Sequence, residues 1–481
     1  MEQPKKKTVK IVEVCKVAPP SAVFAATSPP DSRTCPKSLS LTYLDLLWLR
    51  IPPVQRLIFY EFPTPDDPNT NTTAFFNADI LPRLEHSFSL TLQPFLPLAG
   101  NLTRPQTSLK PVLVYAEGDA VSLTVAESDA DFYRLSGKDQ FFEAREYHPL
   151  VPTLAMSHDR AAVLALQVTL FPNQGLSIGI TMHHAVLDGK SIHLFLKTWA
   201  NTCRSRGTLP ELKPFYDRSV IKDPAGLETI YTKQWLDSEG PNNRSVTCLE
   251  KFTKEVPSDL ARGMFQLTRA GIEKLRHMVK TQMAKNKDNE PLEHISSFSL
   301  TYAYIWVCLA KVEGIINNED QVLLGFAVDC GPRLEPPVPE TYIGNCTGLK
   351  AATIETKENG GLEFWLTEAV KAIGEAEKSL ESDGVLNGAE EWVSRWFCGP
   401  SESRRVRLYT IAGSPRFEIY SMDFGWGRPR KTDVVSIDMN GAISLSDSSG
   451  NGDRGVEVGL VLKKQQMEAF APLFAQGLID S

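Results

Sequence analysis

Two adjacent histidines, His183 and His184, stand near the middle of this 481-residue chain and are followed by Asp188 and Gly189. Histidine can take up and return a proton near neutral pH, because its unperturbed pKa is about 6.5. A rigidly held imidazole is therefore suited to general acid–base catalysis. Only His184 lies four residues before Asp188, so the spacing distinguishes it from its neighbour.

The segments on either side of the histidines predict how they are held. Residues 176–182 form an apolar run that is typical of a buried strand, and residues 191–199 repeat apolar side chains at helical spacing. The histidines are therefore predicted at the C-terminal end of a strand, on the turn into a helix, which is a favoured place for a reactive side chain. Gly189 lets the backbone turn tightly at this point.

A second motif, Asp-Phe-Gly-Trp-Gly at residues 423–427, lies close to the C-terminus. It follows residues 417–422, which have the composition of a strand. Two glycines that flank a tryptophan indicate an irregular turn whose backbone needs freedom at two positions. Nothing in the motif supplies a nucleophile, so we predict that Asp423 caps the turn and that the motif is structural.

Together, the two motifs resemble the signature of the plant BAHD acyl-CoA-dependent acyltransferases, and the resemblance extends along nearly the whole chain. Further matching segments are residues 39–45, 59–62, 95–100 and the Tyr-Ile-Gly-Asn-Cys of residues 342–346. The last resembles an element of the branch that acylates anthocyanins and other phenolic glucosides. The resemblance implies an α/β fold of two chloramphenicol-acetyltransferase-like domains, with the active-site channel between them.

The resemblance also implies roles for the histidine motif. His184 is the general base, and the reaction forms no covalent acyl-enzyme. Asp188 turns away from the channel and pairs with an arginine, so it supports the loop rather than the chemistry. The segment that usually supplies this arginine reads Asp-Cys-Gly-Pro-Arg here, with Gly331 in place of the first arginine. Either Arg333 takes over the pairing or the pair is altered.

Three further residues are candidates for substrate binding. Arg416 could grip acyl or acceptor oxygens, because a guanidinium matches a carboxylate bidentately, although a plain surface arginine fits as well. Ser297, with Ser296, opens a helix whose N-terminal amides could meet a donor phosphate, although ordinary capping explains both serines. Trp48 is the third candidate. No further His or Cys cluster completes a metal site around the histidine motif.

The implied activity is O-acyl transfer from acyl-CoA, a co-substrate rather than a cofactor, to a sugar hydroxyl of a flavonoid, anthocyanin or other phenolic glycoside. Malonyl-CoA is the preferred donor, and hydroxycinnamoyl-CoA or acetyl-CoA is the alternative. A carrier-protein-dependent condensation domain shares the histidine motif, but the second motif and the free-standing length argue against it. Gly331 leaves open a catalytically retired binding protein. The chain has no G-x-S-x-G elbow, which disfavours a serine acyl-enzyme.

Composition limits the partners and the compartment. With 51 basic and 58 acidic residues the net charge is −7, and no sustained basic stripe is present, so neither nucleic acid nor an anionic membrane is an expected partner. Eight scattered cysteines without C-x-x-C pairing indicate reduced thiols. The N-terminus lacks an apolar signal core. We therefore expect a cytosolic monomer.

The chain is long enough for two domains, predicted at residues 1–205 and 246–481 with a crossover segment at 206–245. A strand segment near residues 390–420 is expected to pack with the N-terminal domain. Strands are predicted at residues 9–14, 112–115, 162–171, 176–182, 265–267, 322–328, 443–445 and 456–462, with hairpin turns at 172–175 and 450–453. Helices are predicted at residues 79–92, after Thr268, from Ser297 and at 361–380, with a charged loop at 280–293.

Overall fold

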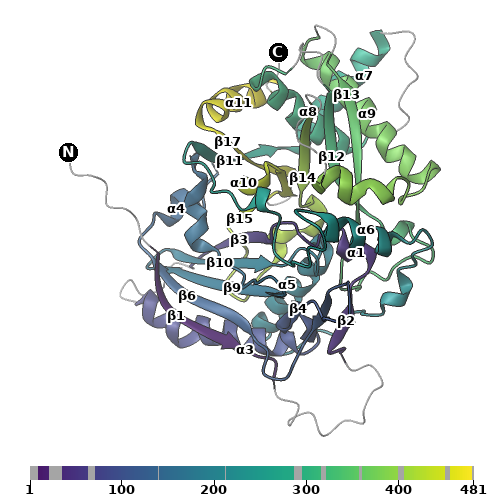
Figure 1. Ribbon diagram of the computed structural model, residues 1–481. Helices are drawn as coiled ribbons and strands as arrows, with labels where there is room; N and C mark the ends of the chain where they lie inside the picture. The colour runs from purple at the N-terminus through teal and green to yellow at the C-terminus, as the bar shows by residue number, and fades with distance from the viewer. Residues whose placement is uncertain are drawn as a thin grey trace.

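The computed structural model describes residues 9–20, 35–62, 71–138, 140–211, 213–285, 295–315, 321–356, 360–398, 406–449 and 455–478. These residues form two α/β lobes, each built around a large mixed sheet with helices packed against it (Figure 1). The predicted fold class is confirmed. The His183–His184 pair lies where the first sheet gives way to a helix.

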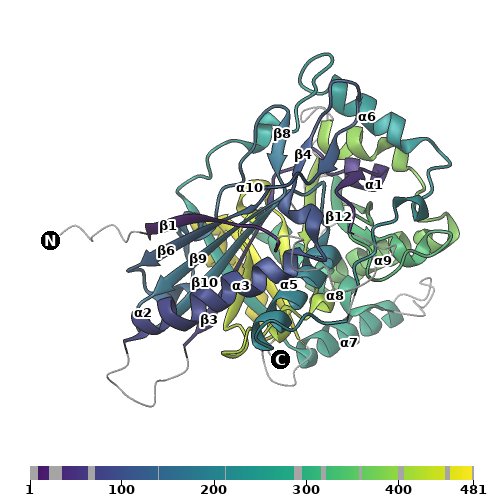
Figure 2. The same ribbon diagram turned by 90° about the horizontal axis from the view of Figure 1, so that it is seen from below.

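The first sheet has six strands in the order β1-β6-β9-β10-β3-β15. In that order the strands are Val9–Val17, Val121–Ser128, Leu164–Phe171, Gly175–Met182, Val54–Glu61 and Lys431–Val434. Helices α3 (Leu81–Leu92) and α5 (Gly189–Arg204) lie across one face of this sheet, as seen from below in Figure 2. Their apolar side chains, including Phe88, Phe195 and Trp199, form one core with the strands.

The second sheet has seven strands in the order β13-β12-β14-β16-β17-β11-β7. In that order the strands are Thr347–Glu355, Gln321–Asp329, Val406–Ala412, Ile443–Asp447, Val456–Lys463, Leu260–Leu267 and Phe142–Glu143. Its helices are α7 (Arg269–Lys285), α8 (Ser297–Val312), α9 (Leu362–Ser382) and α11 (Lys464–Gln476). Trp306 of α8 and Trp365 of α9 meet edge to face at the centre of this core, with ring centroids 6.4 Å apart.

A small four-stranded sheet and several short helices complete the described structure. The small sheet has the order β2-β5-β4-β8, which are Ser38–Ser40, Val112–Val114, Asn101–Thr103 and Arg160–Ala162. The remaining α-helices are α1 (Tyr43–Leu46), α2 (Thr72–Phe75), α4 (Phe132–Leu135), α6 (Leu227–Asp237) and α10 (Ile437–Asn440). Although α1 precedes all but two strands of the chain, its Leu44 and Leu46 are buried in the core of the second lobe.

Two strands are exchanged between the large sheets. Strand β7 precedes the histidine motif yet pairs with β11, and β15 comes from the second half of the chain yet pairs with β3. The packing predicted for the segment near residues 390–420 stays a prediction; β14 in that range pairs with β12 and β16 of the second sheet. Within the range the turn Pro415–Phe417 contacts α5, and Glu418 pairs with Lys197 of that helix at 3.5 Å. The domain boundaries near residues 205 and 245 stay predictions.

Most of the predicted strands and helices are confirmed, and four local predictions are wrong. Residues 417–422 are two short 3-10 turns, because Glu418 adopts a left-handed φ of 49° that a strand does not allow. The helix predicted to begin at Asp79 begins at Thr72, where Asn71 caps it, and runs through a π-turn into α3. Residues 280–285 continue α7. The crossover segment contains α6, whose apolar face the sequence analysis overlooked.

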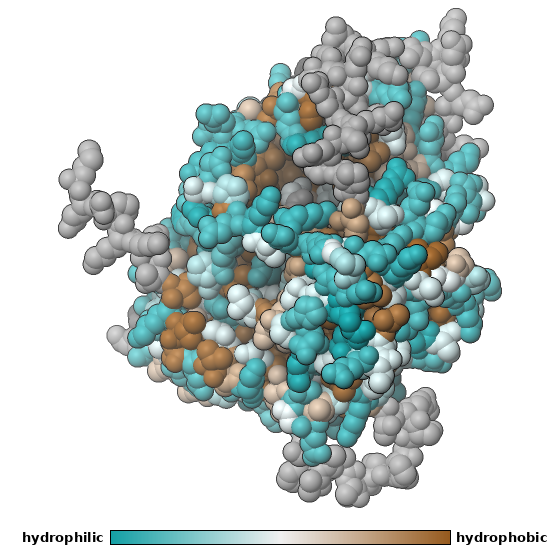
Figure 3. Space-filling model, in the orientation of Figure 1, coloured by the Kyte–Doolittle hydropathy of each residue, from teal (hydrophilic) through white to brown (hydrophobic). Residues whose placement is uncertain are grey.

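Two further predictions fall outside the described residues, namely the rest of the charged loop up to residue 293 and the turn at 450–453. The strands that flank this turn, β16 and β17, pair antiparallel as a hairpin requires. None of the helices in the described part of the chain combines the length and apolar character needed to cross a bilayer. The face in Figure 3 is mostly hydrophilic, with apolar side chains gathered towards edge strand β1, where Ile11, Val12 and Val14 are exposed.

Candidate active site

The histidine loop connects β10 to α5, as the sequence predicts. The backbone N–H of His183 donates to the carbonyl oxygen of Val163 at 2.9 Å, which extends the pairing of β10 with β9 by one step. A tight turn follows, closed by a bond from Val186 N–H to the His183 carbonyl. Asp188 then caps α5 by accepting from the N–H of Ser191 at 2.8 Å. The loop is thus fixed at both ends by regular structure.

The imidazole of His184 stacks on the indole of Trp48, with ring centroids 4.3 Å apart and an angle of 6° between the planes. Trp48 is itself held by a bond from its Nε1 to the carbonyl oxygen of Thr347 at 3.4 Å. Nδ1 of His184 is buried, whereas Nε2 is neither buried nor hydrogen-bonded within the described part of the chain. The structure therefore makes Nε2 the nitrogen available to a substrate hydroxyl.

Burial lowers the pKa of His184 to about 4, and an interaction of the ring with the backbone of the same residue works in the opposite direction. The imidazole is accordingly neutral at physiological pH, which is the form that a general base requires. His183 is also buried and its pKa is lowered to about 4, but its Nδ1 is occupied by the backbone N–H of Ala185 at 3.2 Å. The two rings therefore differ in the availability of their nitrogens, and the division between base and support stays a prediction.

We expect a pH profile that reflects this lowered pKa. The value of kcat/KM should stay level from about pH 8 to about pH 5 and fall only as His184 becomes protonated near pH 4. The free energy of unfolding also decreases as pH falls from about 6.5 towards 4, because the buried histidines bind more protons in the unfolded chain than in the folded one over that range. Initial rates must therefore be measured beside a folding signal. An acid limb centred near pH 6.5 in folded enzyme would contradict the burial of His184.

Asp188 is bound by main-chain donors instead of the predicted arginine. Its Oδ2 accepts from the N–H of Cys346 at 2.9 Å and from the hydroxyl of Thr347 at 3.3 Å, while Oδ1 caps α5. Burial raises the pKa of Asp188, and the N–H donors of Ser191 and Cys346 oppose that change. Arg333 is exposed and donates to the carbonyl oxygen of Asp329 at 2.9 Å. Among the described residues, the pairing of Arg333 with Asp188 is therefore not formed.

A buried polar cluster that sequence reasoning missed holds the other side of the histidine loop. The side chain of Asn345 donates to the carbonyl oxygen of His184 at 3.0 Å and to Oδ1 of Asp45 at 3.2 Å. The same Oδ1 accepts from the backbone N–H of Asn345 at 2.7 Å. Arg218 lies 4.0 Å from Oδ2 of Asp45 and donates to the carbonyl oxygen of Ile343 at 2.7 Å. Asp45 thereby connects helix α1, the crossover segment and the loop that carries His184.

One local signal could have revealed part of this cluster. Thr42 and Asp45 form the capping box of α1, and the pattern of a threonine followed three residues later by an acid is visible in the sequence. The partners Asn345 and Arg218 lie far away along the chain, and no spacing rule connects them to Asp45.

Gly344 must also be small, because a Cβ there would lie 2.0 Å from the Arg218 guanidinium.

The second motif anchors the C-terminal half onto the first lobe. Oδ1 of Asp423 accepts from the N–H groups of Gly425 and Gly427 at 2.7 and 3.0 Å, and both glycines have φ near 112°, as the predicted turn requires. Phe424 packs edge to face on Trp199 of α5 with centroids 4.8 Å apart. Tyr60 of β3 donates to the carbonyl oxygen of residue 422 at 3.1 Å. These contacts set the chain beside β3, where β15 joins the sheet.

The three candidates for substrate binding lie in different settings. The indole of Trp48 stacks on the imidazole of His184. Arg416 is exposed on the turn Pro415–Phe417. The cap of α8 is Ser296, and the carboxylate of Glu377 already accepts from the hydroxyls of Ser299 at 2.6 Å and Ser296 at 3.3 Å. The hydroxyl of Ser297 itself accepts from Arg276 at 3.2 Å, and its part in substrate binding stays a prediction.

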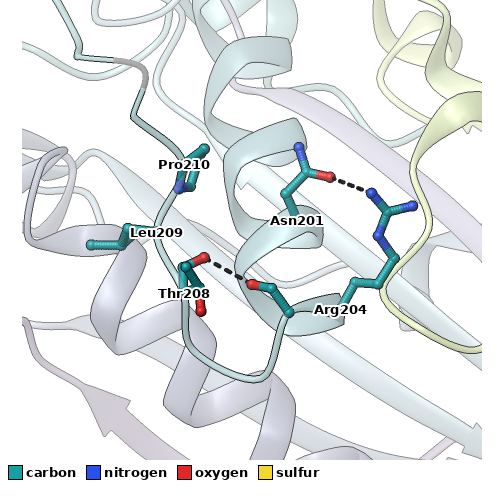
Figure 4. Close-up of a pocket in the computed structure, with 6 residues that line it drawn as sticks. Asn201, Arg204, Thr208, Leu209 and Pro210 are labelled. Carbon is teal, nitrogen blue, oxygen red and sulfur yellow. Dashed lines mark hydrogen bonds between the residues drawn. The ribbon is translucent and has the colours of Figure 1, made fainter.

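The hollow drawn in Figure 4 is remote from this chemistry. It has a volume of about 470 Å³ and is lined by Asn201, Arg204 and residues 205 and 208–210, at the C-terminal end of α5. The histidine loop precedes the N-terminal end of the same helix, and sixteen helical residues span about 24 Å. Arg204 is turned towards Asn201, to which it donates at 3.3 Å. The hollow is therefore a surface feature separate from His184.

Comparison with known proteins agrees with this fold. A family model described as the Transferase family matches residues 26–475. Phenolic glucoside malonyltransferase 1 of Arabidopsis thaliana is 39% identical over 98% of each chain. The malonyl-CoA:anthocyanidin 5-O-glucoside-6''-O-malonyltransferase of the same plant is 40% identical, again over 98% of each chain. The crystal structure of vinorine synthase superposes with a TM-score of 0.67 at 20% identity, covering 98% of this chain and 99% of that one.

The two α/β lobes have the chloramphenicol-acetyltransferase-like fold. Within that class, the chain belongs to the BAHD family of acyl-CoA-dependent acyltransferases and is an enzyme.

Proposed function

We propose that the enzyme transfers a malonyl group from malonyl-CoA to a sugar hydroxyl of a phenolic glycoside, such as a flavonoid or anthocyanin glucoside, with His184 as the general base. The observation that carries the catalytic part is the neutral imidazole of His184, stacked on Trp48 with Nε2 free. The donor and acceptor classes are supported by what the similar plant enzymes are named for. The same proposal places a monomeric enzyme in the cytosol, as the sequence predicts.

The reaction would need no covalent intermediate with the protein. Nε2 of His184 takes the proton of the acceptor hydroxyl while the oxygen attacks the thioester carbonyl carbon. The C–S bond of the tetrahedral intermediate then breaks, and the departing thiolate takes the proton from the imidazolium. The products are the sugar ester and free coenzyme A. The low pKa of His184 favours protonation of the departing thiolate, because the imidazolium of a weakly basic imidazole gives up its proton readily.

Purified protein should release free thiol from malonyl-CoA only when a phenolic glucoside is present, and in equal amount to the ester formed. The donor panel is malonyl-CoA, acetyl-CoA and p-coumaroyl-CoA, and each acceptor is paired with its aglycone, which lacks the sugar hydroxyl. We expect malonyl-CoA to give the highest kcat/KM and the aglycones to give no product. A preference for p-coumaroyl-CoA would overturn the donor assignment. Thiol release without an ester product from any pair would overturn the proposed transfer.

A further inference from the structure

Arg56 of β3 is a buried arginine without a partner. Only 9% of its surface is exposed, yet its guanidinium makes no hydrogen bond or ion pair with any residue that the structure describes. Arg262, by contrast, is a buried arginine that has several partners. It is 1% exposed, pairs with Asp433 at 3.0 Å and Asp438 at 3.3 Å, and donates to two carbonyl oxygens. Unlike Arg104, whose Nε and Nη1 are buried without a partner, Arg56 has no guanidinium nitrogen that is both fully buried and unsatisfied, so a ligand can reach this charge, which no described residue pairs.

The register of the first sheet places Arg56 on the face that α3 and α5 cover. Arg56 lies opposite Ile180 of β10, and side chains of directly paired residues point to the same side of a sheet. Ile180 belongs to the core formed with α3 and α5. Strand β10 ends two residues after Ile180, at Met182, and the histidine loop begins there. Arg56 therefore projects towards α5, beside the strand that leads directly to His184.

His193, on the first turns of α5, is the second unpartnered group at this place. Its Nε2 is buried and has no hydrogen-bond partner in the described structure. Its ring stacks on Phe417 with centroids 5.8 Å apart, and Phe417 also closes against Gly189. Burial, followed by the charges of Lys197 and Arg56, lowers the pKa of His193 to about 3. The influence of Arg56 on this ring agrees with the register argument that the two side chains face each other.

The carboxylates around Arg56 are already engaged elsewhere. Burial lowers the pKa of Arg56 to about 10, and the charges of Asp433 and Asp447 oppose that change, so the guanidinium stays charged at neutral pH. Asp433 binds Arg262 through Oδ1, and its buried Oδ2 has no hydrogen-bond partner in the described structure, Arg56 included. Asp447 accepts from the backbone N–H groups of Ile419 at 2.8 Å and Tyr420 at 3.3 Å. The fork of donors on Arg56 is therefore free for an external acceptor, and a carboxylate fits it bidentately.

We propose that Arg56, assisted by His193, binds the free carboxylate of a dicarboxylic acyl group such as malonyl while its thioester lies at His184. This inference rests on the proposed function, since it assigns the residue that selects the donor. Arg56 thus replaces the exposed Arg416 as the candidate for binding the acyl carboxylate. Because Arg56 is buried, its charge is screened much less by water and salt.

The test compares Arg56→Met with the wild-type enzyme on malonyl-CoA and on acetyl-CoA, which lacks the second carboxylate. We expect kcat/KM for malonyl-CoA to fall by about 10- to 100-fold, mainly through KM, as the loss of a hydrogen bond to a charged group would produce. The value for acetyl-CoA should fall far less. The melting temperature of the free enzyme should not decrease, because the substitution removes an unpaired buried charge. Arg56→Lys should retain an intermediate preference for malonyl-CoA.

Two further arginines serve as comparisons. Arg416→Leu tests the exposed candidate, and Arg430→Met removes an exposed arginine that pairs with Glu61 at the edge of the same sheet. Each of these substitutions should change kcat/KM only slightly, and by the same factor for malonyl-CoA and acetyl-CoA. If the wild-type enzyme does not use malonyl-CoA, the proposed function fails and the inference fails with it. If the wild type uses malonyl-CoA but Arg56→Met lowers kcat/KM equally for both donors, the inference alone is overturned. The same holds if only Arg416→Leu changes the preference between the donors.

Discussion

Replacing His184 by alanine should lower acyl transfer by about 10²- to 10⁴-fold, the range that a general acid–base catalyst contributes. The imidazole has no hydrogen bond to another side chain within the described residues, so its removal takes away the proton acceptor without breaking a network. The substitution also removes the stacking on Trp48. Circular dichroism and the melting temperature should nevertheless stay close to those of the wild type. A variant that keeps more than a tenth of wild-type turnover would show that His184 is not the base.

His183→Ala is the matched control for this prediction. Its ring is 1% exposed and accepts from the N–H of Ala185, so truncation leaves a cavity and an unsatisfied donor under the loop. We expect the melting temperature to fall more than for His184→Ala, and turnover to fall less. The two histidines are neighbours of the same type, and opposite effects on stability and rate would separate the catalytic role from the structural one.

Asp188→Asn should lower stability and turnover together. The asparagine amide would bring an N–H donor against the N–H of Cys346 or Ser191, and an unsatisfied buried donor costs about 1–3 kcal/mol. Turnover should fall by about 10²-fold, as expected when a catalytic group is displaced by about 1 Å. Chemical denaturation and steady-state rates on the same preparation measure both effects. An inactive variant with unchanged stability would instead indicate a direct catalytic role for Asp188.

Arg333→Ala is the control for the role of Asp188. If the carboxylate is held by Cys346 and Thr347, removing this exposed arginine should change the free energy of unfolding by less than about 0.5 kcal/mol and leave turnover near the wild-type value. A decrease comparable with that of Asp188→Asn would restore the arginine pairing that the sequence predicts.

The sequence predicted the local surroundings of His184 well, because they are encoded within about 30 residues. The apolar run of β10 and the helical spacing of α5 follow from periodicity and residue type. The turn at residues 423–427 was predictable for the same reason, since two glycines and an aspartate define it.

What the sequence could not predict depends on contacts between distant segments. Asn345 meets Asp45 across 300 residues, and β15 from the C-terminal half joins β3, close in sequence to Phe424, which packs on α5. Arg56 looks like an ordinary polar residue at the start of a strand, and its lack of a partner becomes visible only when the surrounding carboxylates are placed. The wrong strand at residues 417–422 has a related cause, since the left-handed Glu418 is favoured by Asp447 binding the two N–H groups that follow it.

The most direct test of direct transfer through His184 is a rapid-mixing measurement of thiol release under single-turnover conditions. Enzyme in excess is mixed with malonyl-CoA, first without an acceptor and then with a phenolic glucoside. We predict no release above the background hydrolysis rate in the first mixture, and in the second a single phase that matches ester formation and disappears in His184→Ala. Stoichiometric thiol release by the wild-type enzyme before any acceptor is added would show an acyl-enzyme and contradict His184 as the base of a direct transfer.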